Sequence, residues 1–468
     1  MEIYAYTTLL ILILCFLIQV KYYGVKCFLH PSILFLLIWI LSVISFIIYI
    51  NVGLIYIIFD QSLIEELFGY VSFTALCFIL ASTFSYKKLK NKPVLWTPKF
   101  DEELFKIIST VILLYSLIFF FIGSGFDIVK NREQMVGNEQ WTALHAGSIS
   151  YLQMISSLLF GLSLPMLILS GYFIGKTYYL RYNQKLKINI KIYYFYPFIN
   201  AALNTIAAGG RAGIFSSILF LMMGILLALF KYSDVSTKII YKFLRYGLII
   251  FISFSVFTTY VNVLREGGEV SYARSVVRWD YYPALKPFSG LLQYLTDHYP
   301  GYQLRRVDSI PPEPRLGQTS LSGFTMFSVP VVSQLLGTPI SIQAAFNLYA
   351  PNTLLRGLEL KKANALWTNT TGTVYILLYE DFGYWGTFIA IFIFVIITQW
   401  IFNSIFLKKR TSFLSILPFI LIYYLWSQTI FSHVILGNWM SGFIYSFLIA
   451  DIISSYKKVS FKRIKINV

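Results

Sequence analysis

Arginines, carboxylates and aromatic residues gather in one short stretch of the chain, between positions 265 and 282. A planar guanidinium binds phosphate through two parallel hydrogen bonds and stays charged when partly desolvated. Aromatic faces beside it suit the C–H surfaces of sugar rings, and a carboxylate can accept a proton from a sugar hydroxyl. The stretch favours a site for a phosphorylated, sugar-containing ligand, formed by Arg265, Glu266, Glu269, Tyr272, Arg274, Arg278, Trp279, Asp280, Tyr281 and Tyr282.

The alternative reading of this stretch is a charged helix that emerges from a membrane. Such helices often carry salt-bridged neighbours at i,i+4, as Arg274 and Arg278 are placed around Asp280. Both readings stay open at this point.

A second candidate is Arg211, which lies among small residues in the segment Gly209-Gly210-Arg211-Ala212-Gly213. Small neighbours let an anion approach both the guanidinium and the first amides of the helix that follows. The alternative is a tight hairpin whose arginine touches lipid headgroups.

The third candidate is a polar run, 368–373, followed by a short apolar piece and then by Glu380 and Asp381. The apolar piece, 374–379, is too short to cross a bilayer. We expect a re-entrant or surface helix that turns at Gly383 and Gly386 into the next span. Glu380 and Asp381 fit a functional site or the N-terminal cap of that span equally well.

The histidines and glycines give little sign of metal or nucleotide chemistry. The four histidines are scattered, with no two at metal-ligand spacing, and no phosphate-binding glycine loop is present. The sequence therefore predicts no metal and no other cofactor. His298 stays a candidate catalytic residue because it falls in the large polar segment. Arg306 and Gly317 form an Arg-x10-Gly pair, which a chain with this many Arg and Gly contains by chance.

The composition decides the setting of these candidates. Of the 468 residues, 57% are hydrophobic and only 13% are charged, whereas ordinary globular chains carry about 25% charged residues. Too little polar surface remains to wrap a water-soluble body. A soluble enzyme, a nucleic-acid-binding module and a disordered scaffold are excluded, and the prediction is an all-α, polytopic integral membrane protein.

Apolar runs long enough to cross a bilayer, about 20 residues each, recur along the chain and predict about eleven transmembrane helices. The runs are 3–20, 33–50, 63–85, 103–123, 147–175, 190–207, 213–230, 243–263, 384–407, 412–430 and 434–455.

The net charge of +17 is distributed so that alternate loops collect the basic residues. Such loops are cytoplasmic by the positive-inside rule. Together they hold 24 Lys and Arg, whereas the opposite short loops hold only Lys130, Arg132 and Arg211. The basic loops are 21–30, 86–100, 176–191, 231–245, 408–410 and 456–468. We therefore expect an external N-terminus and a cytoplasmic C-terminus.

This topology divides the chain into four parts. Residues 1–263 hold spans one to eight, and 264–370 form one large external loop with short amphipathic helices on the membrane surface. Residues 371–455 hold the re-entrant segment and the last three spans, and 456–468 form a basic cytoplasmic tail.

The chain resembles the oligosaccharide repeat-unit polymerases, the O-antigen polymerase family of bacterial envelopes. The resemblance rests on about eleven spans with one large outer loop, on the Gly-Gly-Arg-Ala-Gly turn at 209–213, and on the stretch from Asn369 through Tyr379 to Gly386. Members of this family are understood to join undecaprenyl-diphosphate-linked repeat units on the outer face of the inner membrane, without nucleotide sugars.

The resemblance implies roles for the outer residues. Arginines of the outer loops are implicated in the family, which by position points to Arg211, Arg265, Arg274 and Arg278 for the diphosphate. The family's general base has no matching motif here, so Glu266, Glu269, Asp280 and His298 stay candidates, with Tyr272, Trp279 and Tyr281 for sugar stacking. The expected partners are lipid-linked donor and acceptor glycans, membrane lipid and a chain-length regulator protein, but no nucleic acid.

Three other functions fit parts of the pattern. A lipid-linked glycan ligase has the same span count and a similar loop. A flippase or transporter would move the same lipid without chemistry, but it would carry polar residues at mid-membrane depth. A metal-dependent glycosyltransferase with a dolichol-type donor would show an acidic pair in its first outer loop. Asp60, Glu65 and Glu66 are near that position, but Glu65 and Glu66 fall at the edge of a span.

Overall fold

The computed structural model describes residues 2–51, 60–89, 92–122, 151–207, 212–231, 288–296, 298–308, 373–430 and 443–455, together with single positions between 242 and 284. The regular elements in these ranges are helices, which confirms the all-α class for this part of the chain. The labelled helices are α1 Glu2–Tyr23, η1 Gly24–Leu29, α2 Pro31–Asn51, α3 Gln61–Thr83, α4 Tyr86–Leu89, α5 Glu102–Ile122, α8 Tyr151–Tyr182, η3 Ile192–Phe195, α9 Tyr196–Ala207, α10 Ala212–Leu229, α12 Ser289–Thr296, α13 His298–Asp308, α18 Val374–Leu407 and α19 Phe413–Ser427.

Four of the described helical stretches are long and apolar enough to cross a membrane: Glu2–Leu29, Pro31–Asn51, Gln61–Thr83 and Val374–Leu407. Three shorter apolar helices, Gly213–Leu229, Phe413–Ser427 and Phe443–Ser455, also coincide with predicted spans. These helices support a membrane protein, while the count of eleven spans and the sidedness of the loops stay predictions.

The outer face of α18 has the side-chain pattern of a helix in contact with lipid. Trp385 and Trp400, near the two ends of its long part, are 75% and 68% exposed. Between them the exposed side chains are apolar: Ile389, Phe392, Ile393, Ile396 and Ile397. Tryptophan is enriched where a membrane meets water, so this face is well suited to the bilayer.

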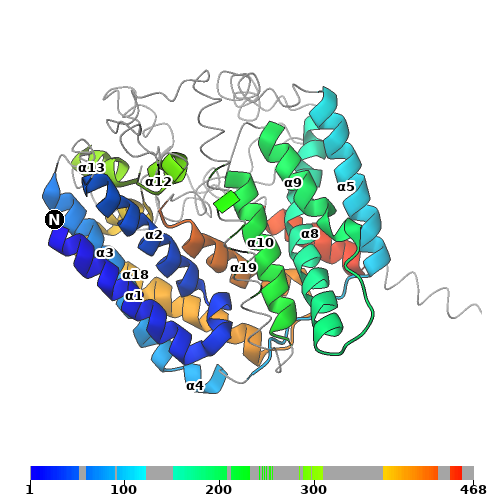
Figure 1. The fold of residues 1–468 in the computed structure, drawn as a ribbon, viewed down its shortest axis with the longest axis horizontal. Helices are drawn as coiled ribbons and strands as arrows, with labels where there is room; N and C mark the ends of the chain where they lie inside the picture. The colour runs from blue at the N-terminus through cyan, green and yellow to red at the C-terminus, as the bar shows by residue number, and fades with distance from the viewer. Residues whose placement is uncertain are drawn as a thin grey trace, which may run out of the picture.

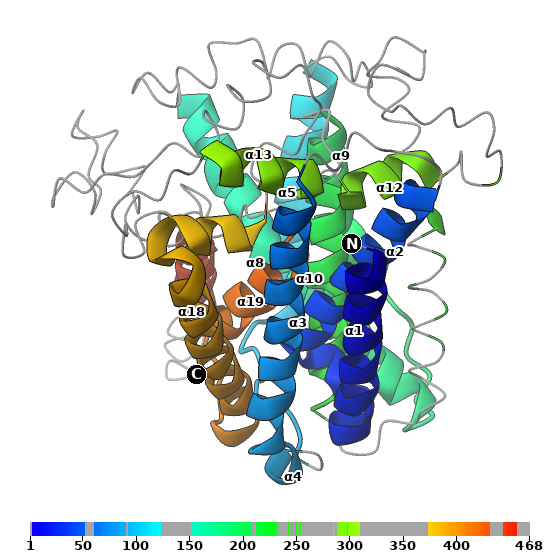
Figure 2. The ribbon, with the colours of Figure 1, turned by 90° about the vertical axis from the view of Figure 1, so that its left-hand side faces the viewer.

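The helices form two groups with α19 between them (Figure 1). One group contains α1, α2, α3 and α18, and the other contains α5, α8, α9 and α10. Each group has its own apolar core, and α19 contributes side chains to both. The short helices α12 and α13 lie across the end of the first group at which α18 begins, whereas α4 lies at the opposite end (Figure 2). The described helices of the predicted external loop, α12 and α13, therefore cover one end of the first group.

The expected turn before the late span is present at Gly383. Its backbone has φ 67° and ψ −173°, a conformation that interrupts α18 and that residues with a Cβ rarely adopt. A short helical segment, 374–382, therefore meets the long segment at an angle (Figure 2). Gly386, the second expected turning point, lies within the long segment.

The second group depends on close backbone contact between α8 and α10. A Cβ added at Gly171 or Gly224 would collide with backbone atoms of the opposite helix, the carbonyl oxygens of Leu221 and Ile168. One added at Gly175 would lie 2.7 Å from the carbonyl oxygen of Ile225. The Gly171-x3-Gly175 spacing is the small-residue pattern by which helices approach closely in membranes.

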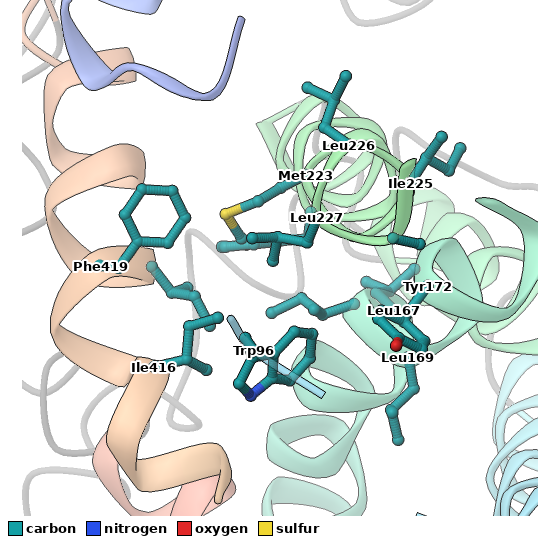
Figure 3. Packing of buried hydrophobic residues seen from close by; sticks show 14 of the residues in the cluster. Trp96, Leu167, Leu169, Tyr172, Met223, Ile225, Leu226, Leu227, Ile416 and Phe419 are labelled. Carbon is teal, nitrogen blue, oxygen red and sulfur yellow. The ribbon is translucent and has the colours of Figure 1, made fainter. Parts of the chain in front are cut away.

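Trp96 fills the space between this helix pair and α19. The side chain is fully buried and lies between Ile416 and Phe419 on one side and Leu167 and Tyr172 on the other (Figure 3). The surrounding segment is fixed by backbone hydrogen bonds with the last turn of α18, from Leu95 N to Ile405 O at 2.9 Å, and with the chain after it, from Arg410 N to Leu95 O at 3.0 Å. A segment predicted to be a cytoplasmic loop is thus built into the core.

The α8–α10 contact predicts opposite effects for two glycine-to-alanine substitutions. Gly224→Ala should lower the free energy of unfolding by about 1–3 kcal/mol, because the new methyl group meets backbone that cannot move aside. Gly69→Ala on α3 is the matched control, because its Cβ meets nothing within 4 Å and alanine favours a helix by about 1 kcal/mol. Thermal unfolding of the purified protein in detergent measures both. Equal midpoints for the two variants would contradict the close packing.

Candidate functional site

Helix α13 presents a row of polar and aromatic side chains to the ends of the helices beneath it. The row falls at one helical face, with spacings of three and four residues. Its members are His298, Tyr299, Tyr302, Gln303 and Arg306. All except Arg306 are fully buried, and they contact side chains of α2, α3 and α18.

The strongest contact of this row is the ion pair between Arg306 and Glu66 of α3. Nε of Arg306 lies 3.0 Å from Oε1 of Glu66, and Nη2 lies 3.2 Å from Oε2, so the pair is bidentate. The hydroxyl of Tyr302 donates to the same Oε1 at 2.5 Å. The guanidinium carbon lies 3.7 Å from the ring centroid of Tyr379, in the first segment of α18. Three helices therefore meet at one charged pair.

Electrostatics keep both α13 members of this group in their usual charge states. Burial lowers the pKa of Arg306, but the bonds to Glu66 more than offset that effect and the pKa is raised overall. The pKa of Tyr302 is raised well above its ordinary value, first by burial and then by the charge of Glu66. The group holds an arginine cation and a neutral phenol at all physiological pH values.

A second contact joins α13 to α2 through His298. Its Nε2 lies 3.3 Å from the hydroxyl of Ser42, which also lies 2.9 Å from the Tyr299 hydroxyl. The imidazole packs edge-on against Trp39, with centroids 5.2 Å apart. Nδ1 is buried and has no hydrogen-bond partner among the described residues. Burial lowers the pKa of His298 to about 3, so the ring is neutral.

The start of α3 is attached to α13 by its capping residue. Asp60 accepts hydrogen bonds from the backbone and hydroxyl of Ser62 at 2.9 and 2.7 Å, which satisfies the first turn of the helix. The backbone N–H of Asp60 donates to Oε1 of Gln303 at 2.9 Å. Because the cap fixes where α3 begins, it also fixes the position of Glu66 relative to α13.

The first segment of α18 completes the site. Tyr375 is held by a 2.9 Å hydrogen bond between its hydroxyl and that of Thr74, and the segment's start is tied to Thr429 by a backbone bond from Val374 at 3.0 Å. Glu380 and Asp381 are both buried in this segment and both have interaction partners. Their role as caps or site residues stays a prediction.

Of the residues predicted to bind or act on the lipid-linked glycan, His298 is the one that the structure describes. It lies in the α13 row, within a turn of Tyr302. The other predicted residues lie outside the described residues: Arg211, Arg265, Glu266, Glu269, Tyr272, Arg274, Arg278, Trp279, Asp280 and Tyr281. Their roles stay predictions.

The Arg306–Glu66 pair is not evident from the sequence. There Arg306 belongs to a chance Arg-x10-Gly spacing, and Glu66 is an acidic residue near the first outer loop. The available signal was the repeat of His298, Tyr302 and Arg306 at four-residue intervals, which places them on one helical face. That repeat shows a shared face but does not identify the partner on α3.

Metal-ligating side chains do not cluster in the described ranges, where no group of three His, Cys, Asp or Glu residues could hold an ion. The described cysteines, Cys15, Cys27 and Cys77, are buried free thiols. The chemistry of the described site is therefore that of hydrogen bonds, one ion pair and aromatic faces.

No protein-family model, no curated protein and no solved structure matches the chain.

The ion pair predicts a stability coupling between α13 and α3. Glu66→Gln and Arg306→Gln should each lower the free energy of unfolding by about 1–3 kcal/mol, because each leaves a charge that is 19% exposed or less without its partner. The free energy of unfolding lost in the double variant should be smaller than the sum of the two single losses. The difference, about 0.5–3 kcal/mol, is the interaction energy of the pair. Thermal unfolding in detergent gives the cycle, and strict additivity would show that the two side chains are not coupled.

Burial of His298 predicts acid sensitivity. The folded pKa of about 3 lies below the ordinary value of 6.5, so the unfolded chain binds the proton more readily. The stabilisation of the folded state by the neutral His298 is fully present above pH 6.5. It falls by about 1.4 kcal/mol for each pH unit below 6.5. His298→Gln should therefore show a weaker loss of melting temperature between pH 7.5 and 5.5 than the unmodified protein. Parallel curves for the two proteins would contradict a buried neutral imidazole.

Proposed function

We propose that this chain is a membrane glycosyltransferase that polymerises undecaprenyl-diphosphate-linked oligosaccharide repeat units at the outer face of the bacterial inner membrane, in surface polysaccharide (O-antigen) synthesis. The observation that carries the proposal is the docking of α13, from the predicted external loop, onto the ends of α2, α3 and α18. A polar and tyrosine-rich site thereby lies where apolar helices end. That is the depth at which the diphosphate of a membrane-embedded lipid meets water.

The energy source of the proposed reaction follows from its location. No nucleotide sugar is available outside the membrane, so the leaving group must be a lipid diphosphate. Negative charge develops on that diphosphate as the glycosidic bond breaks, and arginines held at the membrane surface stabilise it. The proposed diphosphate ligands are Arg211, Arg265, Arg274 and Arg278, by the family resemblance.

The acceptor sugar must lose a proton as it attacks. Glu266, Glu269, Asp280 and His298 are the proposed proton acceptors, and Tyr272, Trp279 and Tyr281 are proposed to stack against sugar rings. The scheme needs no metal or other cofactor, because arginine side chains supply the positive charge. The proposed partners are the lipid-linked donor and acceptor glycans, membrane lipid and a chain-length regulator protein.

The proposal predicts the surface glycan of a strain that lacks this chain. Each lipid should carry a single repeat unit in place of a ladder, because transfer to the lipid continues while polymerisation stops. The ladder, resolved by gel electrophoresis and mass spectrometry, should return on complementation. Complete absence of glycan in the deletion strain would instead indicate a ligase or a flippase.

Complementation with arginine-to-lysine variants tests the residue assignments. At least one of Arg211→Lys, Arg265→Lys, Arg274→Lys and Arg278→Lys should shorten the ladder, with a rate loss of roughly ten- to hundredfold, because an ammonium cannot make the paired bonds of a guanidinium. Lys191→Gln is the control. Lys191 pairs with Glu102 at an exposed position in a predicted cytoplasmic loop, so its loss should leave the ladder unchanged. Full ladders from all four arginine variants at matched protein levels would refute these ligands.

A further inference from the structure

Among the described residues, the Arg306 guanidinium is hydrogen-bonded along one edge. Glu66 takes the edge formed by Nε and Nη2. A guanidinium carries five N–H donors, and the bonds to Glu66 use two of them. The remaining edge, formed by Nη1 and the second N–H of Nη2, has no hydrogen-bond partner among the described residues.

The surroundings of Arg306 fix the direction of that unoccupied edge. The ring of Tyr379 lies against the flat face of the guanidinium at 3.7 Å, and the Tyr302 hydroxyl holds Glu66 in place at 2.5 Å. The arginine side chain is 19% exposed, so it is neither free in solvent nor fully sealed. A guanidinium clamped on one edge and one face is pre-organised to bind two oxygens of an anion with its other edge.

An exposed aromatic surface suited to lipid lies close to the ion pair. Tyr70 is four residues after Glu66 on α3, and its hydroxyl donates to the backbone carbonyl of Tyr384 at 3.3 Å. Tyr384 and its neighbour Trp385 are 41% and 75% exposed, at the start of the lipid-facing part of α18. An anion bound to Arg306 would therefore lie beside a surface suited to an attached hydrocarbon chain.

The Glu102–Lys191 pair shows what a plain surface ion pair of this protein looks like. Its side chains are 37% and 47% exposed, and one carboxylate oxygen receives Lys191, Tyr193 and Tyr194. Each carboxylate receives three hydrogen bonds, and each cation has N–H donors without an acceptor among the described residues. The pairs differ in geometry and exposure, because Arg306 is held by two parallel bonds and is 19% exposed, whereas Lys191 makes one bond and is 47% exposed.

We infer that Arg306 is a binding residue for the phosphate oxygens of a polyprenyl diphosphate, and that Glu66 is the positioning residue that turns the guanidinium's unoccupied edge toward it. The inference rests on the proposed function for the lipid class, and it adds a ligand from α13 that is separate from the four arginines named above. No proton or covalent bond is transferred in this step. Glu66 acts only through Arg306.

Direct binding to the purified full chain in nanodiscs tests the inference without any polymerisation. The probes are undecaprenyl diphosphate, the neutral alcohol undecaprenol and inorganic pyrophosphate, with affinities measured by intrinsic tryptophan fluorescence. Arg306→Lys should weaken undecaprenyl diphosphate binding roughly ten- to hundredfold, because the paired bonds are lost while the charge stays. Undecaprenol binding should not change. Lys191→Gln, which removes a positive charge from the Glu102 pair, is the control and should bind both lipids normally.

Further variants separate positioning from folding. Glu66→Gln should weaken undecaprenyl diphosphate binding several-fold, although it leaves the arginine charged, and Glu66→Asp should recover part of that loss. If Arg306→Lys does not fold, Tyr379→Leu removes the face against which the guanidinium rests and should weaken binding in the same selective way. Tyr379→Phe keeps the face and should not.

Each result decides the inference. Unchanged undecaprenyl diphosphate affinity in folded Arg306→Lys and Tyr379→Leu, or an equal loss for undecaprenol, would overturn it. If pyrophosphate competes with undecaprenyl diphosphate and loses affinity equally in Arg306→Lys, the headgroup alone supplies the recognition. If pyrophosphate does not compete, recognition requires the attached lipid. The two proposals can fail separately. If the variants selectively lose undecaprenyl diphosphate binding but deletion of the chain removes all surface glycan, the diphosphate site stands and the polymerase function is refuted.

Discussion

A polar group that lies among apolar helices has no water to bond with, so its partners must come from the protein. Gln399 of α18 shows how the helices meet this constraint. Its amide nitrogen lies 3.2 Å from the Tyr23 hydroxyl, 2.8 Å from the Ser85 hydroxyl and 2.8 Å from the Asn403 carbonyl oxygen. Its carbonyl oxygen lies 3.0 Å from Nε2 of His30. One side chain thus joins α1, α18 and the turns that follow α1 and α3, and sliding any of them would strand buried polar atoms.

The opposite end of the same helix group meets the constraint with charge. Glu66 and Arg306 satisfy each other where α3, α13 and α18 converge, and Tyr302 adds a third bond. At the Gln399 end the neutral hydrogen bonds use most of the donors and acceptors, so that network holds helices together and has little capacity left for a ligand. At the Arg306 end, two of the five guanidinium N–H groups bond Glu66, and the described residues offer no acceptor to the other three. This unused capacity distinguishes the site proposed to receive an anion from a network that only maintains packing.

The helices were predictable from the sequence because each apolar run must be buried in lipid or in protein, and the Gly383 turn was predictable because glycine and polar residues interrupt such a run. The site was predictable only in part. Arg306 and Glu66 are 240 residues apart, and their pairing depends on how α13 lies across α3, which no local pattern encodes. The cap at Asp60 is local, but its bond to Gln303 and the position of Trp96 in the core depend on contacts between distant segments, which the sequence does not reveal. His298 was identified by its place in the polar segment, but its burial could not be read from the sequence.

The described side chains include an arginine suited to a diphosphate, but neither His298 nor Glu66 is well suited to accept a proton in the proposed transfer. The pKa of His298, lowered by burial to about 3, makes its neutral imidazole a weak base. Glu66 is engaged by Arg306 and by Tyr302, and accepting a proton would weaken both bonds. A glycosyl transfer in which the bond to the leaving diphosphate is largely broken before attack needs little help in removing the acceptor's proton. Charge stabilisation by arginine is then the larger demand on the protein, and the proposed role of Arg306 on α13 supplies part of it.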